Sequence, residues 1–378
     1  MRKPFPKLIF LSKPHMGGRE LPLVQQAFET NWLSTVGPNL RALEAYFPQR
    51  WKVNAVALAS GTAAIHLGLK AMGVGEGSEV LVSTLTFAAS ANPILYLGGK
   101  PIFVDSETAS WNLDPNLLAD FLRQRARANR LPKALELVHI FGQSANLKDI
   151  MEICATYELP LIEDAAEALG TTCGGQQVGT FGELGVFSLN GNKIITCSGG
   201  GVLVGRNPAW LNTVRHWSTQ ARDPNPENNY LHTQMGYNYS LSNVLAGIAL
   251  GQLEELETRV TQRRQVFRRY AEAFADIPDL VPMPEAPWGQ STRWLSCFLV
   301  SPRAKLTAGN LIRRLFQLNI ESRPVWKPLH SQPVFQSYER VGGAVAEGLN
   351  QNGICLPSSS NLTPEEQEFI IESVRESL

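Results

Sequence analysis

The feature that most constrains the fold is the alternation of strand-length apolar runs with helix-like stretches through the first two thirds of the chain. Most of each run is continuously apolar, which is typical of parallel strands that are covered by helices on both faces. The runs are AVALAS at 55–60, EVLVS at 79–83, KPIFVD at 100–105, ALELVHI at 134–140 and LPLIED at 159–164. The pattern predicts an α/β protein with a mostly parallel sheet.

The pattern changes after Ser240, where a second, smaller body is expected. Apolar side chains then recur with helical spacing, which predicts one long helix over 241–276. A Pro-rich break, PDLVPMPEAP, separates this helix from a strand-like run and further helices. The last helix has clear start signals in Thr363, Pro364 and Glu366. Since 378 residues exceed the usual size of one core, we predict a large domain at 1–240, a linking helix at 241–276 and a small α+β domain at 277–378.

Charge and cysteine content argue against several classes of protein. Lys+Arg and Asp+Glu are both 34, so the chain has no general electrostatic attraction to nucleic acid or to an anionic membrane. The apolar run near the N-terminus, LIFL, is too short for a signal peptide, and no segment is long enough to span a bilayer, so we expect a cytoplasmic protein. The five cysteines are scattered without a CxxC pair, which favours neither a disulfide framework nor a zinc site, and no metal is expected.

The stretch AVALASGTAAIHL predicts a strand, a short turn and a helix, with Ser60, Gly61 and Thr62 at the turn. Such a turn directs backbone N–H groups and the positive end of the helix dipole at an anion. Gly61 allows close approach of the backbone, and the flanking hydroxyls can donate hydrogen bonds. The same residues also make an ordinary helix cap, so this stretch alone leaves phosphate binding open. Neither a Walker loop nor a G-x-G-x-x-G motif is present, which disfavours ATP and dinucleotide sites.

Three further residues have chemical significance if they meet this turn. The strand LPLIED ends in Asp164 at the carboxyl edge of the sheet, where the side chain could cap a helix or hold a cationic ring nitrogen. Lys193, between the apolar stretches FSL and IIT, is either a solvated hairpin residue or a buried nucleophile. Phe87 could be a core residue or could stack on a ring. A phosphate cradle, a carboxylate and a lysine amine are the groups that pyridoxal 5′-phosphate (PLP) requires, so their combination predicts a PLP site.

Longer motifs carry a resemblance to a known family. They are SGTAAIHLGLKAMGVGEGSEVLVSTLTFAASAN, LIEDAAEALG, GTFGELGVFSLNGNKIITCSGGGVLVG and GYNYSLSNVLAGI. In this order they resemble the DegT-like nucleotide-sugar aminotransferases, and the likeness extends from PHMGGRE near the N-terminus to GICLPSS near the C-terminus. The resemblance implies a fold-type I PLP enzyme, with a mostly parallel seven-stranded sheet and a smaller C-terminal α+β domain. It also implies a homodimer whose active sites lie at the subunit interface.

The resemblance assigns roles to individual residues. Lys193 matches the lysine that forms a Schiff base with the cofactor, and Asp164 matches the carboxylate on its pyridinium nitrogen. Glu167 matches a position facing the hydroxyl side of the cofactor, and Phe87 matches the stacking aromatic. The positions that match phosphate contacts are Gly61, Thr62 and Ser188, with Asn238 expected to reach the phosphate of the other subunit.

The resemblance also indicates substrate contacts. Residues matching the loop that touches the sugar nucleotide are Asn31, Trp32, Leu33 and Ser34. In the phrase RPVWKPLHSQPVF, Trp326, Lys327 and His330 are candidates for nucleotide contacts, although packing accounts for Trp326 equally well and His330 could be an ordinary core histidine. Asn190 and Asn192 could position substrate or could shape the turn before Lys193.

Three phrases most resemble enzymes that aminate C4 of a UDP-linked 4-keto-6-deoxy-N-acetylglucosamine, on the route to UDP-N-acetylbacillosamine. They are EDAAEALG, SLNGNKIITCSGGG and RPVWKPLHSQPVF. L-Glutamate is the donor that the resemblance implies, but Ser240 stands where relatives carry an arginine, so Arg222 or Arg323 would have to compensate. The alternatives are an aminotransferase that acts at C3 or on a GDP- or dTDP-linked sugar, and a non-catalytic sugar-nucleotide sensor. Related sugar dehydratases place histidine at the lysine position, so Lys193 argues against that activity.

Overall fold

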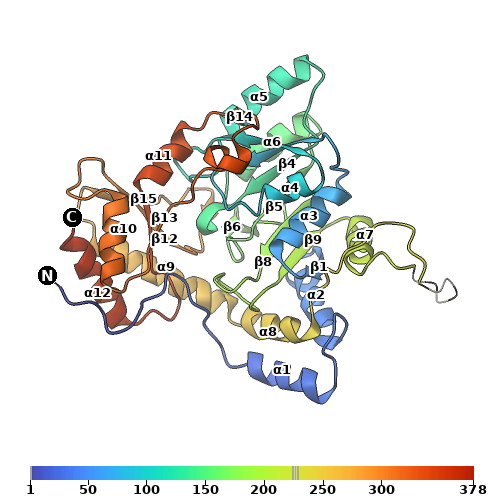
Figure 1. Ribbon diagram of the computed structural model, residues 1–378, viewed down its shortest axis with the longest axis horizontal. Helices are drawn as coiled ribbons and strands as arrows, with labels where there is room; N and C mark the ends of the chain where they lie inside the picture. The colour runs from blue at the N-terminus through green and yellow to red at the C-terminus, as the bar shows by residue number, and fades with distance from the viewer. Residues whose placement is uncertain (1, 224, 226, 228–229) are drawn as a thin grey trace.

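The computed structural model describes residues 2–223, 225, 227 and 230–378, and its main body is a large sheet with helices on both faces (Figure 1). The described strands of this sheet are eight, in the order β1-β9-β8-β5-β4-β2-β3-β14. Adjacent strands pair in parallel except that β9 runs antiparallel to both of its neighbours. Their bounds are β1 Asn54–Leu58, β2 Glu79–Ser83, β3 Lys100–Val104, β4 Ala134–Val138, β5 Leu161–Asp164, β8 Leu184–Ser188, β9 Gly201–Gly205 and β14 Arg340–Val341.

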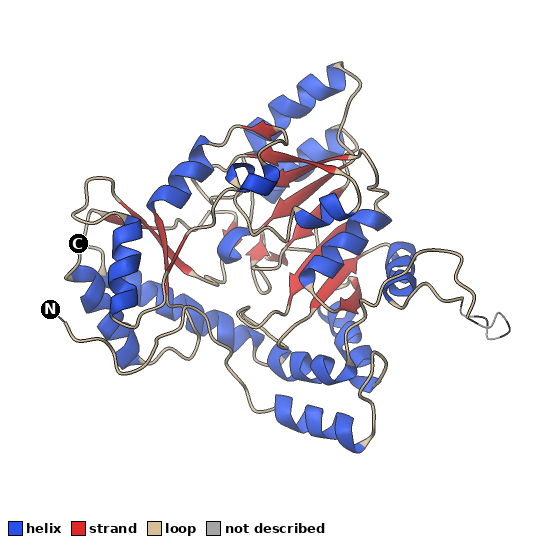
Figure 2. Cartoon of the chain, in the orientation of Figure 1, coloured by secondary structure: helices blue, strands red, loops and turns tan. Residues whose placement is uncertain are grey.

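Seven strands of this sheet confirm the mostly parallel α/β prediction; they are β1, β9, β8, β5, β4, β2 and β3. The eighth, β14, is a short edge strand from the C-terminal third of the chain. Figure 2 shows the helices on both sides of the sheet. The α-helices are α1 Glu20–Glu29, α2 Pro38–Trp51, α3 Gly61–Ala71, α4 Asn92–Tyr96, α5 Pro115–Arg127, α6 Leu147–Thr156, α7 Pro208–Ser218, α8 Asn243–Leu253, α9 Leu256–Ala273, α10 Ala308–Gln317, α11 Ala344–Asn352 and α12 Pro364–Arg375. Short 3₁₀ turns occur at Ile140–Gly142, Leu329–Ser331 and Pro333–Phe335.

Two apolar cores, one on each face, hold these layers together. On one face α2, α5, α6 and α8 pack on the sheet, and on the other face α3, α4 and α7 do so. Successive residues of β2 divide between the two cores, with Leu81 in the first and Val80 and Val82 in the second. This alternation is the reason that the strands read as continuously apolar, because both of their faces are buried.

The smaller body is an antiparallel four-stranded sheet with its own core. Its strands, in the order β10-β12-β15-β13, are Leu280–Pro282, Ser296–Val300, Gly353–Leu356 and Arg323–Pro324. The N-terminal segment, predicted as part of the large domain, packs here instead: Phe5 and Ile9 are buried in this core, and Ile9 bridges to Ile320. The last helix, α12, begins as predicted, because Thr363 and Glu366 form a reciprocal capping box. Three two-residue strands, β6 Thr172–Cys173, β7 Gln176–Gln177 and β11 Gly289–Gln290, form a separate small sheet.

The segment predicted as one long helix over 241–276 is two helices, α8 and α9, which are separated at Glu254 and Glu255. α8 is apolar on all sides, and its small residues allow other backbone to come close: a Cβ on Gly251 would lie 2.7 Å from the backbone nitrogen of Glu20. α9 is rich in arginine and presents only part of its surface to the core. The break lets each helix turn its own apolar surface inward. Within the described residues, no helix is both long and apolar enough to cross a membrane.

Asp105 fastens the C-terminal third of the chain to the edge of the large sheet. Its carboxylate accepts hydrogen bonds from the backbone N–H groups of Gly343 (2.6 Å), Val345 (3.1 Å) and Ala346 (2.9 Å), at the start of α11. The side chain is buried, and β14 pairs with β3 beside it. A carboxylate at a helix N-terminus satisfies donors that have no partner within the helix.

We predict that Asp105→Ala lowers the free energy of unfolding by about 3 kcal/mol, because three N–H groups, two of them buried, lose their acceptor. Urea unfolding followed by circular dichroism measures this loss. The matched control is Asp114→Ala, which removes an ordinary helix cap that accepts one backbone N–H, that of Asn116, and should cost about 1 kcal/mol. Equal losses for the two variants would contradict a special role for Asp105.

Candidate active site

A cavity of about 320 Å³ lies at the carboxyl ends of the parallel strands, where open α/β sheets bind ligands. The end of each of three neighbouring strands contributes a side chain: Val138 from β4, Asp164 from β5 and Ser188 from β8. Eleven of the residues that the sequence singled out line this one cavity. They are Ser60, Gly61, Thr62, Phe87, Asp164, Glu167, Ser188, Asn190, Asn192, Lys193 and Trp326.

One end of the cavity is the N-terminus of α3. Ser60 caps the helix by accepting a hydrogen bond from the N–H of Ala63 (3.0 Å). Among the described residues this leaves the N–H groups of Gly61 and Thr62 without a hydrogen-bond partner, and both residues line the cavity. A Cβ on Gly61 would lie 3.3 Å from Cβ of Ser188, so a larger residue would crowd this corner. Free N–H groups at a helix start make this end suitable for an anion.

Asp164 lies on the cavity wall with its carboxylate held from two sides. Oδ2 accepts a hydrogen bond from Oγ of Ser90 (2.7 Å), and Oδ1 accepts one from the N–H of Ala166 (3.0 Å). Oγ of Ser90 is in turn 2.8 Å from Oγ1 of Thr86. Asp164 is only 4% exposed, and these two neutral donors do not neutralise it. A buried carboxylate of this kind favours a cationic partner inside the cavity.

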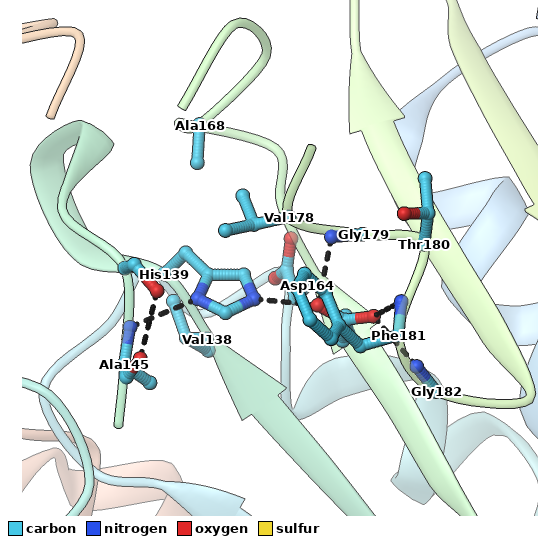
Figure 3. Close-up of polar contacts among 12 residues, drawn as sticks. Val138, His139, Ala145, Asp164, Ala168, Val178, Gly179, Thr180, Phe181 and Gly182 are labelled. Atoms are coloured by element: carbon cyan, nitrogen blue, oxygen red, sulfur yellow. Dashed lines mark hydrogen bonds and ion pairs between the residues drawn. The ribbon is translucent and has the colours of Figure 1, made fainter. Parts of the chain in front are cut away.

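Glu163, the neighbour of Asp164, is fully buried on the opposite face of β5, because successive strand residues alternate between faces. Figure 3 shows the residues around this end of β5, among them His139, Gly179 and Phe181. Its carboxylate accepts hydrogen bonds from the backbone N–H groups of Gly179 (2.7 Å), Phe181 (2.7 Å) and Gly182 (2.8 Å). Nε2 of His139 is 2.9 Å from the same carboxylate. Nδ1 of His139 accepts from the N–H of Ala145, so the ring proton is on Nε2 and the histidine donates to Glu163. This network fixes the end of β5 from behind the cavity.

Lys193 is a partly enclosed cavity residue and not a solvated hairpin residue. Its side chain is 13% exposed, and its backbone N–H closes the turn by donating to the carbonyl of Asn190 (3.0 Å). Nζ lies 3.7 Å from Oε1 of Glu167 and 4.0 Å from the ring centroid of Trp294. The amine therefore has a carboxylate and an aromatic face as near neighbours.

Glu167 connects the lysine to an aromatic wall. Oε2 accepts a hydrogen bond from the N–H of Phe141 (2.8 Å), and Oε1 accepts a long one from Nε1 of Trp326 (3.3 Å). Burial raises the pKa of Glu167, and the nearby Lys193 only partly offsets this effect. Glu167 therefore retains a proton to higher pH than an exposed glutamate.

Phe87 stands at the mouth of the cavity and is 55% exposed, so it is not a core residue. Its ring centroid lies 5.3 Å from that of Trp326, which stacks on Phe141 at 6.2 Å and 13°. Phe141 in turn stacks on Trp294 at 6.4 Å and 23°. These four rings form one continuous aromatic wall.

A second cavity, of about 610 Å³, adjoins the first and shares Thr86, Phe87, Asn192, Trp294 and Trp326 with it. The charged residues of its lining are Glu321, Arg323 and Lys327. Arg323 is 65% exposed and hydrogen-bonds to Glu321 at 2.8 Å, so its guanidinium retains free donors. The second cavity can therefore take a larger, polar and anionic molecule.

His330, expected near the substrate, does not line either cavity. It is buried, with Nδ1 2.6 Å from Oγ1 of Thr84 and Nε2 2.9 Å from Oε1 of Glu347. Both ring nitrogens are thus occupied by structural contacts, and the interpretation as an ordinary buried histidine fits this geometry. Of the two arginines considered for the donor, Arg323 reaches a cavity, whereas Arg222 lies against the ring of Tyr230.

Several predicted contacts lie on the surface, away from both cavities. The loop Asn31–Ser34 is exposed and docks on the start of α8, where Asn243 donates to the carbonyl of Trp32 (3.0 Å). Asn238 is also exposed. Residues that serve the site of another subunit would have this placement, and their predicted roles stay predictions.

Sequence reasoning missed Ser90 and Trp294. Both residues stand in stretches that read as ordinary turn or strand, STLTFAASAN and WLSCFLV, and no local pattern distinguishes them. Their significance comes only from contacts with Asp164 and Lys193, which lie far away in the sequence.

The first cavity fits PLP by the chemistry of its groups. The two free N–H groups at the start of α3 suit a phosphate, and a side chain in place of Gly61 would crowd Ser188 at this corner. Asp164 suits a protonated ring nitrogen, and Lys193 provides the amine for the aldehyde. Phe87 offers an exposed ring face at the mouth.

Comparison with known proteins agrees with this fit. The profile of the DegT/DnrJ/EryC1/StrS aminotransferase family matches residues 14–375. The chain is 46% identical over 372 residues to the Bacillus subtilis (strain 168) protein named "Putative pyridoxal phosphate-dependent aminotransferase EpsN". The matched region covers 97% of this chain and 95% of that protein. It is 33% identical over 368 residues to a GDP-perosamine synthase of Caulobacter vibrioides, over 97% of each chain. The crystal structure of aminotransferase TlmJ from Streptoalloteichus hindustanus has a TM-score of 0.89 and 26% identity, over 98% of both chains.

The family match covers nearly the whole chain, and the cavity holds the groups that the cofactor of this family needs. The fold agrees as well, since the large mostly parallel sheet and the small C-terminal body are shared with structurally characterised aminotransferases. The chain therefore belongs to the DegT/DnrJ/EryC1/StrS aminotransferase family and is a PLP-dependent sugar aminotransferase.

Proposed function

We propose that this enzyme transfers an amino group from L-glutamate to C4 of a UDP-linked 4-keto-6-deoxy-N-acetylhexosamine. The product is a UDP-4-amino-4,6-dideoxy-N-acetyl sugar. The observation that carries the proposal is that Lys193, Asp164 and the start of α3 line one cavity, which adjoins a larger cavity with Arg323 and Lys327 in its wall. The choice of a UDP-linked substrate is supported by the resemblance of the phrases EDAAEALG, SLNGNKIITCSGGG and RPVWKPLHSQPVF.

Bound PLP supplies a conjugated ring that takes up electron density from the carbon that loses its proton. Asp164 keeps a proton on the ring nitrogen, because its buried charge is best compensated by a cation. Lys193 is the general base, whose amine removes the proton from the α-carbon of glutamate and later places a proton on C4 of the sugar. Glutamate leaves as 2-oxoglutarate, and the sugar leaves with an amino group in place of its keto oxygen.

The residues around Lys193 orient these proton transfers. Glu167 lies 3.7 Å from Nζ and can hold the amine while it carries a proton. The hydroxyl chain from Thr86 through Ser90 keeps the carboxylate of Asp164 from rotating. Phe87 and Trp326 cover the mouth and limit the access of water.

Anion recognition is assigned to the second cavity. Arg323 can form paired hydrogen bonds with a carboxylate or a phosphate, and Lys327 adds a second positive charge. Since Ser240 replaces the arginine of relatives and Arg222 lies away from both cavities, Arg323 is the residue that we assign to the donor carboxylate.

We infer that the enzyme works as a homodimer with shared active sites. The support is that Asn238 and the loop Asn31–Ser34 are exposed in the single chain, although the resemblance gives them ligand contacts. Large apolar side chains are exposed in the same region, with Trp32 42%, Leu33 41% and Val36 54% exposed. A second copy that covers this patch would add these residues to a site.

The 33% identity to GDP-perosamine synthase favours a second candidate substrate, a GDP-linked keto sugar. We predict that purified enzyme with PLP and L-glutamate converts the UDP-linked 4-keto-6-deoxy-N-acetyl sugar in preference to GDP- and dTDP-linked keto sugars. Product identification by NMR gives the carbon that is aminated and its configuration. Preference for the GDP-sugar, or amination at C3, would replace the substrate assignment, and no turnover of any keto sugar would favour a sensor.

We predict that Lys193→Arg lowers kcat by about 100- to 10,000-fold, because the variant keeps the positive charge but loses the base. It should also lose the absorption band of covalently held PLP, and borohydride treatment should no longer fix the cofactor to this peptide. The control is Lys148→Arg, a change at an exposed position on α6 that should alter neither the band nor the rate. Normal turnover by Lys193→Arg would refute the role of this lysine.

We predict that Arg323→Ala raises KM for L-glutamate about 10- to 100-fold and changes kcat little, because it removes hydrogen bonds that form equally in ground and transition states. Steady-state kinetics with each substrate varied in turn separates the two binding steps. Arg222→Ala is the matched control and should leave both KM values unchanged. A rise in KM for the sugar alone would move Arg323 from the donor to the nucleotide.

A further inference from the structure

Trp294 stands in an unusual relation to the reactive lysine. Nζ of Lys193 lies 4.0 Å from the centroid of the Trp294 ring, well inside the range over which an ammonium is attracted to an aromatic face. The same residue lines both cavities. Among the described residues, the charged side chains that share the lining of the first cavity with Lys193 are Asp164 and Glu167, and Glu167 forms the ion pair with it.

The ring of Trp294 is held in one orientation. It is 1% exposed, and its Nε1–H donates to the backbone carbonyl of Asn192 (2.8 Å), the residue directly before Lys193. Its backbone carbonyl accepts from Nη1 of Arg263 (2.6 Å), and its ring stacks on Phe141. Rotation of the ring would break the bond to Asn192, so the face remains directed at the amine.

The bonds from Trp294 close a ring of contacts around the lysine turn. The carbonyl of Asn192 also accepts from Oγ of Ser12 (2.7 Å), and Oγ of Ser12 accepts from Nη2 of Arg263 (3.1 Å). Arg263 is 1% exposed and also donates to the carbonyl of Ser358 (3.0 Å). Burial lowers the pKa of Arg263 to about 9, so its guanidinium is still charged at neutral pH. The N-terminal segment, α9 and the start of β12 are thereby tied to the turn that carries Lys193.

We propose that Trp294 is a positioning residue that holds the free ammonium of Lys193 at the cavity wall by a cation–π contact. The inference rests on the proposed role of Lys193 as the base, and goes beyond it by assigning the group that holds the lysine when it carries a proton. A base that moves a proton between two carbon atoms has to stay in place in both of its charge states. Glu167 attracts the ammonium from one side, and the ring of Trp294 attracts it from the other.

The competing explanation is that Trp294 only fills the core between the two bodies. The two explanations differ in what happens to the charged form of the amine. Loss of mere packing would change the accessibility of Lys193 at every pH, whereas loss of the aromatic face would make the ammonium less favourable than the neutral amine.

The test uses three variants of the full chain. Trp294→Leu removes the aromatic face, and Trp294→Phe keeps a face while losing the N–H to Asn192. The matched control is Trp288→Phe, because Trp288 also donates its Nε1–H to a backbone carbonyl, that of Ser144 (3.1 Å), and does not line either of the two cavities. Circular dichroism and urea unfolding establish that each variant is folded.

The first readout is acetylation of Lys193 by acetic anhydride in the PLP-free protein, followed across pH by peptide mass spectrometry. We expect Trp294→Leu to move the midpoint of this pH profile downward by about 0.5 to 1 unit, with a smaller shift for Trp294→Phe and none for Trp288→Phe. The second readout is steady-state kinetics of the loaded enzyme, where Trp294→Leu should lower kcat at least 10-fold and leave KM for the sugar within about 3-fold.

An unchanged midpoint in folded Trp294→Leu overturns the proposal, whether or not kcat falls, because the ring then only packs. If Trp294→Leu does not fold, the midpoint of Trp294→Phe decides, and a profile identical to that of Trp288→Phe overturns the proposal. Failure of the proposed function is distinguishable, since the acetylation profile requires no substrate and Lys193→Arg tests the base directly.

Discussion

The end of β5 is the constraint on which the rest of the site depends, because it buries two adjacent carboxylates. A strand sends successive side chains to opposite faces, so Glu163 and Asp164 never compete for the same space. Glu163 is satisfied completely, by three backbone N–H groups and His139. Asp164 accepts hydrogen bonds from only one hydroxyl and one N–H, and it lines the cavity, where its carboxylate can accept further hydrogen bonds. The strand thus presents a carboxylate that still favours a cation.

Burial raises the pKa of two other carboxyl groups near β5. Both oxygens of Glu136 on β4 lack a hydrogen-bond partner within the described residues. Burial, reinforced by the charge of Asp164, raises the pKa of Glu136 well above its usual range and so favours its neutral form. Burial also raises the pKa of Glu167. Asp164, in contrast, lines the first cavity, where a protonated ring nitrogen would be its cationic partner under the proposed function.

Local sequence patterns predicted the large sheet and the cofactor end of the site. They did not predict the contacts between the two bodies. Continuous apolar runs reveal buried parallel strands wherever both faces are covered, and Gly61 marks the close approach at α3. The split between α8 and α9, the return of β14 to the large sheet and the docking of Phe5 depend on distant partners. The structural role of His330 depends on Thr84 and Glu347, which contact its two ring nitrogens. No local pattern links these residues to His330, so the sequence left a substrate contact open.

The two walls of the site come from different bodies of the chain. The large body provides the phosphate end, Asp164 and Lys193, whereas the small body and its linker provide Trp294, Arg323 and Trp326 on the opposite wall. Asp105 and β14 fasten the two bodies together, so the second wall is positioned before any substrate arrives. Under the proposed function, substitutions along that wall would change which sugar nucleotide fits without touching the large-body residues of the first cavity. Trp294 lies on that second wall and yet contacts both the amine of Lys193 and the carbonyl of Asn192, so a change there acts on the lysine rather than on the fit of the sugar.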